Sequence, residues 1–516
     1  MTNPGASGCP RPTRPVRRVC AATGALVVVA TLSALAGAGG QGAPAADALQ
    51  AQRTYAAGLD FLKAGQRQQA EQEFKRVIDV FAETPVWDAA VLKLSELHFD
   101  AGDLAQARTH IEKLTADRRA LPSTPMARVL LGRILLEQRR DPKRLDDAVS
   151  EFRRVRQYHP GNAAIAAATY YEAEARRLSF AYDQALAAYR EVATAYPRTP
   201  WAARALLGEA RCLVKLGRGA SALEPLQQVR ERFAGTPEAH TALQWNTILY
   251  RLFLKGAPAY RPAERSIPAA PGKLKDVEAL LIGPDGTVYA GAPDMLSRFD
   301  AASGATRPGP GAAGTRGLVA QGDHVVVVQR GALATPGGAV VPLAASRAGT
   351  TEPRALDAVR AAVVTSLREW LVADRDLKSI LRYSPAMKAD GVFAALPADR
   401  LAIDAEDRVA VLDAEAGVID LVLPDGRSTG RIGKATRDFE KAIDIAFDGL
   451  GFLYVLDREA GAVRVFEVAD KVRPRAVFSV PPKMPGAFRK ATAVALDAGG
   501  RLFIYDESLA RIQVYQ

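Results

Sequence analysis

The sequence predicts two repetitive domains in series, an all-α first half and an all-β second half. Three observations lead to this prediction. Residues 50–255 repeat with a period of about 37 and carry helical spacing, a stretch rich in Pro, Ala and Gly follows, and the remainder repeats as short β-hairpins. The chain has 516 residues, 48% of them hydrophobic and 24% charged, which is the composition of an ordinary globular protein of several domains.

The helical repeat is marked by an alanine followed by large apolar residues four and seven positions later. This i, i+4, i+7 spacing forms one face of an α-helix, and the alanine lets a neighbouring helix approach closely. A further helix precedes each of these, with Gly132 and Gly208 where two helices are expected to touch. The alanines are Ala70, Ala107, Ala148, Ala185 and Ala222; the apolar residues are Phe74, Ile111, Phe152, Tyr189 and Leu226, then Val77, Leu114, Val155, Val192 and Val229.

A Thr-Pro pair precedes the apolar run of four predicted helices, at Thr84, Thr124, Thr199 and Thr236. A threonine hydroxyl caps the free backbone N–H groups of a helix, and proline suits the first helical position, where an N–H has no partner. Asn162 takes the capping position in the repeat without the pair. We therefore expect each pair to end one helical hairpin and to start the next.

This pattern of a small residue, Ala-x3-aromatic and a proline resembles the tetratricopeptide repeat, in the longer-helix form of bacterial envelope proteins. The resemblance covers residues 49–255 as about five repeats, capped by the apolar helix within "PEAHTALQWNTILYRLFL". It implies a groove lined by the first helix of each unit, which binds a protein or peptide. The residues that this frame turns toward the groove are Tyr55, Glu96, Arg133, Tyr170, Glu174, Arg177 and Glu209.

The second half repeats a turn and two strands. The stretches 404–413, 448–457 and 497–506 each begin and end with Asp, and we expect these carboxylates to accept backbone N–H groups at turns. Three weaker copies begin at Gly283, Ala320 and Thr365. The spacing is that of a four-stranded blade, and residues 273–516 resemble a six-bladed β-propeller of the NHL type. Residues 256–272 form the predicted linker.

The last predicted blade needs a fourth strand after "RIQVYQ" at 511–516. An open edge leaves backbone groups unpaired, and residues 263–269 are the nearest extended segment. The prolines Pro262 and Pro268 suit an outer strand. We therefore expect residues 263–269 to pair with 511–516 and to tie the linker to the end of the propeller.

The first 48 residues resemble an export signal. "RPTRPVRR" is basic, the run from Val19 to Gly40 is apolar, and Ala46-Asp47-Ala48 is a small-residue cleavage site. We expect a periplasmic or extracellular protein, with an uncleaved membrane anchor as the alternative. Cleavage leaves Cys212 as the single cysteine, which excludes an internal disulfide. The net charge of +11 is spread thinly, and the densest run, 139–156, mixes both signs, so we expect no nucleic-acid partner.

Catalytic and metal-binding patterns are absent from the sequence. No two of the five histidines have metal-ligand spacing, and the "GPGAAG" of 309–314 lacks the flanking strand and helix of a dinucleotide site. We therefore predict no catalytic, cofactor-binding or metal residues and no enzyme activity. The predicted function is an exported scaffold or adaptor that binds protein partners through the helical groove and a propeller face. The alternatives are a propeller-channel enzyme or small-ligand or metal binder, and a structural part of an envelope assembly.

Overall fold

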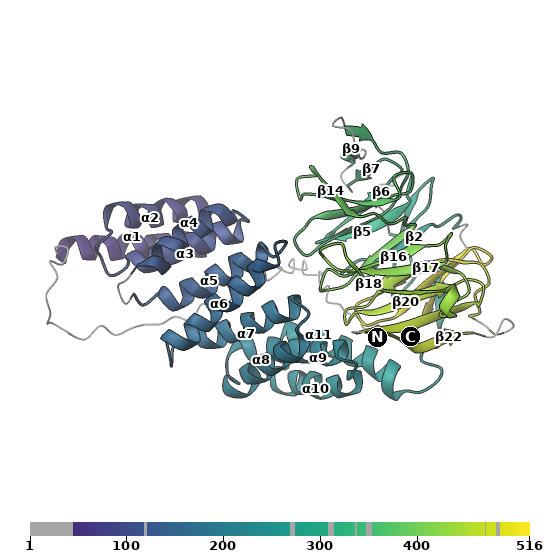
Figure 1. Cartoon of the computed structure of the whole chain (residues 1–516), viewed down its shortest axis with the longest axis horizontal. Coiled ribbons are helices and arrows are strands. Elements are labelled where there is room, and N and C mark those ends of the chain that lie inside the picture. Colours follow the sequence, from purple (N-terminus) through teal and green to yellow (C-terminus); the bar gives the residue numbers. More distant parts are fainter. Residues whose placement is uncertain are drawn as a thin grey trace, which may run out of the picture.

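The computed structural model describes residues 45–117, 121–268, 274–307, 314–335, 338–346, 353–469, 471–480, 484 and 486–516. A helical solenoid lies beside a ring of small β-sheets (Figure 1). The predicted export signal lies outside the described residues, apart from its last four, which begin the first helix. Among the described helices, none combines the length and apolar content that a bilayer crossing requires.

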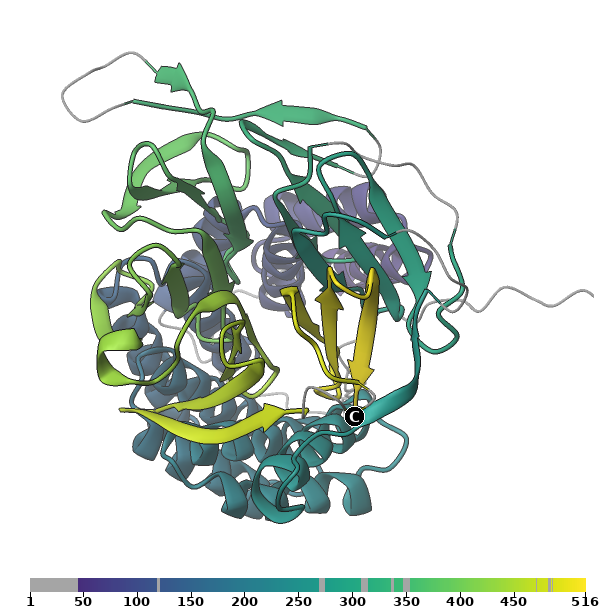
Figure 2. The ribbon, with the colours of Figure 1, turned by 90° about the vertical axis from the view of Figure 1, so that its right-hand side faces the viewer.

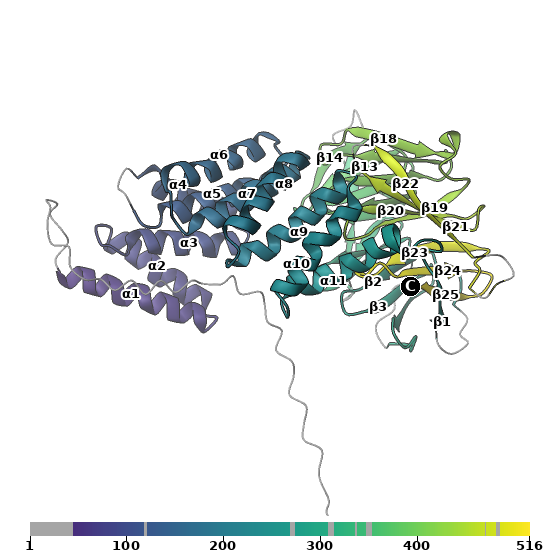
Figure 3. The same cartoon turned by 90° about the horizontal axis from the view of Figure 1, so that it is seen from below.

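The solenoid consists of antiparallel helical hairpins, and Figures 1 and 3 show α1–α4 far from the propeller and α9–α11 beside it. A 3₁₀ turn, Gly219–Ala222, precedes α10, and a π-helical turn, Tyr250–Leu254, extends α11. The helices are α1 (Ala45–Lys63), α2 (Arg67–Val80), α3 (Trp87–Asp100), α4 (Leu104–Ala116), α5 (Thr124–Glu137), α6 (Lys143–Tyr158), α7 (Ala164–Leu178), α8 (Tyr182–Ala195), α9 (Pro200–Lys215), α10 (Leu223–Arg232) and α11 (Pro237–Leu249).

The repeat positions predicted from the sequence form the solenoid core. All five alanines, and the ten apolar residues that follow them, have 0% exposed surface. Glycines on the first helices meet rings on the second helices: a Cβ on Gly132 would lie 2.3 Å from Phe152, and one on Gly208 would lie 2.5 Å from Tyr189. The helices therefore touch where the sequence places its smallest residues, as expected from close packing.

The Thr-Pro pairs lie at or just before the starts of α3, α5, α9 and α11, where we expected them, but the threonines act differently. Of these four threonines, only Thr236 accepts a cap hydrogen bond among the described residues, from the Ala239 N–H at 3.2 Å. The hydroxyls of Thr84, Thr199 and Thr236 all donate to the carbonyl three residues earlier, at the end of the preceding helix. The expectation of a general N-cap was therefore wrong, because these hydroxyls satisfy orphan carbonyls instead. Asn162 does cap, accepting from the Ala164 N–H at 2.8 Å.

The second half is a six-bladed β-propeller (Figure 2). Each blade is an antiparallel sheet numbered outward from the channel, and a two-stranded arm, β9 (Ala344–Ser346) with β10 (Pro353–Ala355), lies between blades two and three. Blade one contains β2 (Ala279–Ile282), β3 (Thr287–Gly291) and β4 (Leu296–Asp300); blade two contains β5 (Gly317–Gln321), β6 (His324–Val328), β7 (Ala332–Ala334) and β8 (Val340–Pro342). Blade three contains β11 (Val359–Val364), β12 (Trp370–Asp374), β13 (Ser379–Tyr383) and β14 (Ala389–Ala394); blade four contains β15 (Arg400–Ile403), β16 (Val409–Asp413), β17 (Val418–Val422) and β18 (Ser428–Gly433). Blade five contains β19 (Ala442–Phe447), β20 (Phe452–Asp457), β21 (Ala462–Val468) and β22 (Val472–Ser479); blade six contains β23 (Ala491–Leu496), β24 (Leu502–Asp506) and β25 (Arg511–Tyr515).

Blade six is completed by the segment that precedes the propeller. Strand β1, Pro262–Ile267, pairs antiparallel with β25, with Pro262 opposite Tyr515 and Ile267 opposite Ile512. Arg261 and Gln516 exchange two further backbone hydrogen bonds of 2.9 Å. The pairing predicted from the open edge is therefore confirmed for β1; residues 269–273 lie outside the described part.

The recurring aspartates have the structural role that was predicted. Asp404, Asp448 and Asp497 each accept backbone N–H groups two and four residues later, at the turn between the first two strands of their blades. Asp457 and Asp506 accept from the segments entering their blades. The turns that contain Asp404, Asp448 and Asp497 face the solenoid and position the site described next.

Candidate functional site

The two domains meet at a joint formed by the ends of the last solenoid helices and the turns of blades four to six. Lys215, the last residue of α9, reaches into the turn between β15 and β16. Its Nζ lies 2.8 Å from Asp404 Oδ2 and 3.1 Å from Glu406 Oε2. Lys215 is only 1% exposed, so its charge is stabilised by these carboxylates and by the carbonyl end of its own helix.

Arg177 extends this contact along the joint. It pairs with Glu406 and, at 2.8 Å, with Glu174, which also accepts a hydrogen bond from the Tyr189 hydroxyl. We call Glu174, Arg177, Lys215, Asp404 and Glu406 the interdomain charge cluster. Burial disfavours the ionised form of Glu406, but Lys215 and Arg177 outweigh burial and lower its pKa. Burial opposes the charge of Lys215 as well, but the two carboxylates raise its pKa.

Glycines let the solenoid approach the other turns of the joint. A Cβ on Gly451 would lie 2.4 Å from Lys215 Nζ, and one on Gly500 would lie 2.7 Å from Ile248. Arg251 donates to the Gly500 carbonyl at 2.8 Å, and the Tyr260 hydroxyl donates to the same carbonyl at 3.0 Å. Side chains in place of these glycines would push the domains apart.

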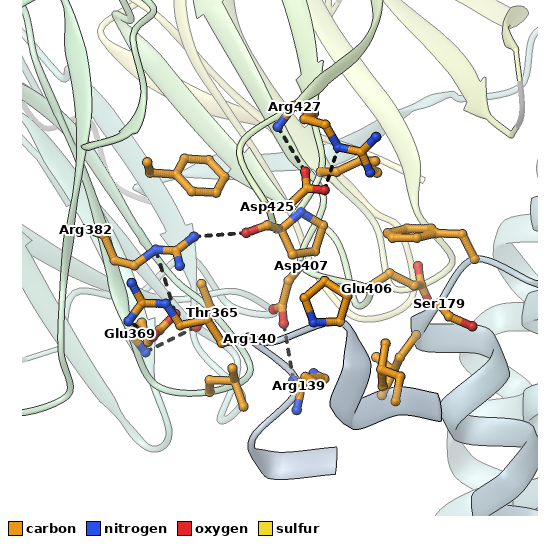
Figure 4. A pocket seen from close by; sticks show the side chains of 18 of the residues that line it. Arg139, Arg140, Ser179, Thr365, Glu369, Arg382, Glu406, Asp407, Asp425 and Arg427 are labelled. Atoms are coloured by element: carbon orange, nitrogen blue, oxygen red, sulfur yellow. Dashed lines mark hydrogen bonds and ion pairs between the residues drawn. The ribbon is translucent and has the colours of Figure 1, made fainter. Parts of the chain in front are cut away.

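Beside the joint, the domains separate into a cleft of about 280 Å³ (Figure 4). We call this the interdomain cleft. The solenoid lines it with the α5–α6 turn and with the end of α7, and blades three and four line the other side. Its apolar lining comes from both domains: Leu145, Leu178 and Phe180 from the solenoid, Leu371 and Phe393 from blade three. A concave site with apolar walls and a few polar groups is the usual form of a binding pocket.

Arg382, on β13, is the least satisfied polar side chain of the cleft. Its guanidinium stacks 5.1 Å from the ring of Phe393 and donates to the Pro424 carbonyl at 2.9 Å. Its Nε is buried and has no hydrogen-bond partner among the described residues; the nearest carboxylate oxygen, of Glu369, is 4.0 Å away. Burial lowers the pKa of Arg382, although Glu369 opposes this. A buried donor without a partner favours a ligand that carries an acceptor.

The rim of the cleft is charged and partly strained. Arg140 pairs with Asp390 and lies 3.8 Å from Glu369, with 47% of its side chain exposed. Asp407 has a left-handed backbone, with φ of 61°, and accepts the Ser366 N–H at 2.7 Å while facing Arg139 at 3.3 Å. A non-glycine residue in this conformation persists only where its surroundings fix it, often at binding sites.

Three of the predicted groove residues lie on the distant half of the solenoid. Tyr55 packs against Phe74 with ring centroids 5.6 Å apart, and burial raises its pKa to about 12. Glu96 pairs with Lys93 and lines a shallow pocket beside α1 and α3. Arg133 stacks over Phe99 at 4.5 Å. All three keep partial exposure, and their role in a groove stays a prediction.

The other four predicted residues lie close to the joint. Glu174 and Arg177 belong to the interdomain charge cluster, where Arg177 contacts the propeller. Tyr170 lies within 5.2 Å of Trp201, in an aromatic cluster, and burial raises its pKa. Glu209 pairs with Arg190 at 2.7 Å. The structure therefore brings Tyr170, Glu174 and Arg177 into one neighbourhood, away from Tyr55 and Glu96.

The cleft residues of blade three were missed by the sequence analysis. Arg382 and Phe393 lie in a blade whose repeat is weak, and nothing in their spacing points to a domain 200 residues earlier. The joint left a clearer signal, because glycines occupy two of the three strongest turns: Gly449 and Gly451 in residues 448–457, and Gly500 in residues 497–506. A Cβ on Gly449 would lie 3.0 Å from Trp245, which shows the same close approach.

The structure offers little reactive chemistry in the residues it describes. No group of three or more His, Cys, Asp or Glu among them is placed to hold a metal ion. His98 and His110 stack with centroids 5.5 Å apart, a contact that their spacing did not predict, and burial lowers the pKa of His110. Cys212 is buried, which raises its pKa to about 12 and leaves the thiol protonated and unreactive at neutral pH.

Family models match two stretches of the first half. Residues 20–158 match a tetratricopeptide repeat-like domain, and residues 178–245 match a tetratricopeptide repeat. The first half is a tetratricopeptide-repeat solenoid. Its repeats extend through the joint, because α8 and α9 belong to the second match. Comparison with curated proteins gives no match.

Solved structures similar to this chain include a domain named as a β-propeller and two enzymes. The WD40 β-propeller domain of Doa1 is 14% identical, with a TM-score of 0.36 over 50% of this chain and 96% of that one. A gluconolactonase from Xanthomonas campestris is 16% identical, with a TM-score of 0.37 over 49% and 98%. Virginiamycin B lyase from Staphylococcus aureus is 9% identical, with a TM-score of 0.37 over 50% and 99%. These scores carry no conclusion about activity.

Proposed function

We propose that this protein is an exported, non-enzymatic adaptor that holds a protein partner between its solenoid and its propeller. Tetratricopeptide repeats and propellers both serve mainly as surfaces for protein interaction. The observation that carries the proposal is the interdomain cleft, because a segment bound there contacts both domains at once. The interdomain charge cluster beside it fixes the angle between the two walls.

The chemistry of the cleft indicates what part of a partner fits. Its apolar walls suit an aliphatic or aromatic side chain. The Nε of Arg382, which makes no hydrogen bond within the described residues, suits a carbonyl or carboxylate oxygen next to that side chain. A peptide segment supplies both within a few atoms. The groove residues Tyr55, Glu96 and Arg133 would extend the same contact along the solenoid.

Export is part of the proposal because of residues 1–48. Their basic start, apolar run and Ala46-Asp47-Ala48 ending favour transport out of the cytoplasm, and an exported adaptor meets its partner in the cell envelope. An N-terminal sequence of the protein purified from the envelope tests this directly. A mature chain that starts at Leu49 supports cleavage, and a chain that retains the apolar run supports the anchored alternative.

Site-specific photo-crosslinking tests the adaptor. A crosslinking residue replaces Ser179, which is exposed and lines the cleft, or Thr194, which is exposed on α8 and does not line it. We expect a discrete crosslinked partner from position 179 and none from position 194. Crosslinking from 179 should fall in an Arg140→Glu variant, which changes the rim charge without touching the buried joint. Equal crosslinking from both positions, or none from 179, would contradict the proposal.

A further inference from the structure

The propeller encloses a second cavity, along its own axis. The innermost strands of all six blades surround a channel pocket of about 220 Å³, and Figure 2 looks along this axis with the solenoid behind the ring. Short apolar side chains such as Ala402, Ala446 and Leu281 line much of its length. The cavity is smaller than the roughly 300–1,000 Å³ pockets that hold drug-sized ligands, so it suits a small molecule.

The two ends of this channel differ in chemistry. The solenoid packs on the turns that follow the innermost strands, as Lys215 and Ile248 show. The beginnings of these strands therefore lie at the opposite, free end. Arg316, Arg360 and Arg400 stand at or beside the beginnings of β5, β11 and β15. Because blades two, three and four are neighbours, the three arginines gather on one side of the free mouth.

Carboxylates from blades one and five balance part of this charge. Arg316 Nη1 donates to both carboxylate oxygens of Glu278, at 2.7 and 2.9 Å. Arg400 reaches across the channel to the Glu278 carbonyl at 3.1 Å and lies 3.5 Å from Asp444. Arg360 is exposed and has no ion pair among the described residues. Three guanidinium groups thus face two carboxylates, which leaves one positive charge at the mouth.

The remaining positive charge is that of Arg360, which can pair with a ligand. Glu278 and the Asp444 region already fix Arg316 and Arg400, so these two define the mouth, while Arg360 is available. A guanidinium binds a carboxylate through two parallel hydrogen bonds. Burial also raises the pKa of Asp444 to about 6, although Arg400 and two backbone N–H groups oppose this, so its negative charge at the mouth is weakened in mild acid.

We propose that the axial channel binds a small monocarboxylate with a short apolar chain. Its carboxylate pairs with Arg360 at the mouth and neutralises the single excess charge, and its apolar chain enters the channel between the alanine and leucine side chains. An inorganic anion satisfies only the mouth, and a cation is repelled by it. This site lies on the face away from the solenoid and does not depend on the proposed adaptor function.

Isothermal titration calorimetry of the full chain with pentanoate, acetate and pentylamine tests the site. Pentanoate should bind about 50-fold more tightly than acetate, because three additional buried CH₂ groups each favour binding. Pentylamine should not bind. Equal affinities for acetate and pentanoate would contradict the apolar part of the proposal, and the absence of pentanoate binding would overturn it.

Two arginine variants locate the binding. Arg360→Gln should weaken pentanoate binding about tenfold or more, since it removes a charged hydrogen bond. Arg354→Gln, at another exposed strand position of the same domain but outside the channel, should leave binding unchanged. Both variants change exposed side chains, and circular dichroism confirms their fold. Unchanged affinity in Arg360→Gln, or equal loss in both variants, would overturn the assignment.

Discussion

The solenoid and the propeller are both built from repeats, but they end differently. Each solenoid hairpin packs mainly on its immediate neighbours, and the stack stays open at α1. The propeller is closed, because β1 pairs with β25 from the far end of the domain. Damage to one hairpin of an open stack affects mainly its neighbours. Damage to the closing strand pair of a ring exposes a strand edge and removes the closure on which every blade depends. The joint connects the open solenoid to the closed propeller.

Deleting residues 511–516 should have the largest effect. It removes β25, leaves β24 with an open edge and frees β1, so the ring no longer closes. We expect loss of most of the propeller's unfolding free energy, about 5 kcal/mol or more, while the solenoid stays helical. Limited proteolysis with far-UV circular dichroism measures both domains.

Deleting residues 45–63, which form α1, is the matched truncation of the open domain. It should shorten the solenoid and leave the unfolding of the propeller unchanged. If the two truncations damage their domains equally, the contrast between open stack and closed ring is wrong.

Lys215→Met should have the next largest effect, because it breaks the joint. It removes the cation that the buried Asp404 and Glu406 share, which leaves Glu406 with Arg177 alone and Asp404 with Arg408 at 3.9 Å. We expect a loss of about 3–5 kcal/mol, as for a broken buried pair. Chemical denaturation measures this. The control, Lys93→Met, breaks the one-third-exposed pair with Glu96 and should cost about 0.5 kcal/mol or less. Similar losses in both variants would show that the joint is not a rigid connection.

The buried Asp448, in the turn between β19 and β20, should make the stability of the propeller depend on pH. Burial raises its pKa from 3.8 to about 6, partly opposed by hydrogen bonds from Leu450, Phe452 and Tyr454. The folded state therefore binds this proton more tightly than the unfolded state, and the free energy of unfolding falls as pH rises from about 4 to about 6. Asp448→Asn lacks this titration and should gain about 2–3 kcal/mol relative to the wild type across that range. Parallel stability curves for the two proteins would refute this expectation.

Gly132→Ala should have the smallest effect and should stay within the open stack. The new Cβ would lie 2.3 Å from the Phe152 ring, and the overpacking outweighs the roughly 1 kcal/mol that alanine adds to helix propensity. We expect a net loss of about 1–2 kcal/mol in thermal unfolding of the solenoid only. Ser150→Ala, exposed on α6, serves as control with a change of about 0.5 kcal/mol or less. An equal loss of stability in the propeller would contradict the expectation that damage to the open stack stays local.

The repeats were predictable because their signals are local. The spacing of Ala148, Phe152 and Val155 alone defines a buried helix face, and all three are fully buried. The turn aspartates follow equally from short-range patterns, and the closing strand follows from counting the strands of the last blade. The joint and the cleft were not predictable in this way, because Arg382 and Leu178 meet only after two domains have folded and docked. Arg177 illustrates the limit: its position on α7 was clear, but not that Glu406 would be its partner.

The pairing of β1 with β25 also sets an order of events during synthesis. A ribosome releases β1 about 250 residues before β25, and the solenoid emerges earlier still. The helical repeats, whose contacts are local, can fold while translation continues, whereas blade six waits for its last strand. Until then β1 is an unpaired strand attached to a folded neighbour, available to a chaperone or to another nascent chain. Residues 511–515 therefore decide when the folded solenoid acquires a completed propeller beside it.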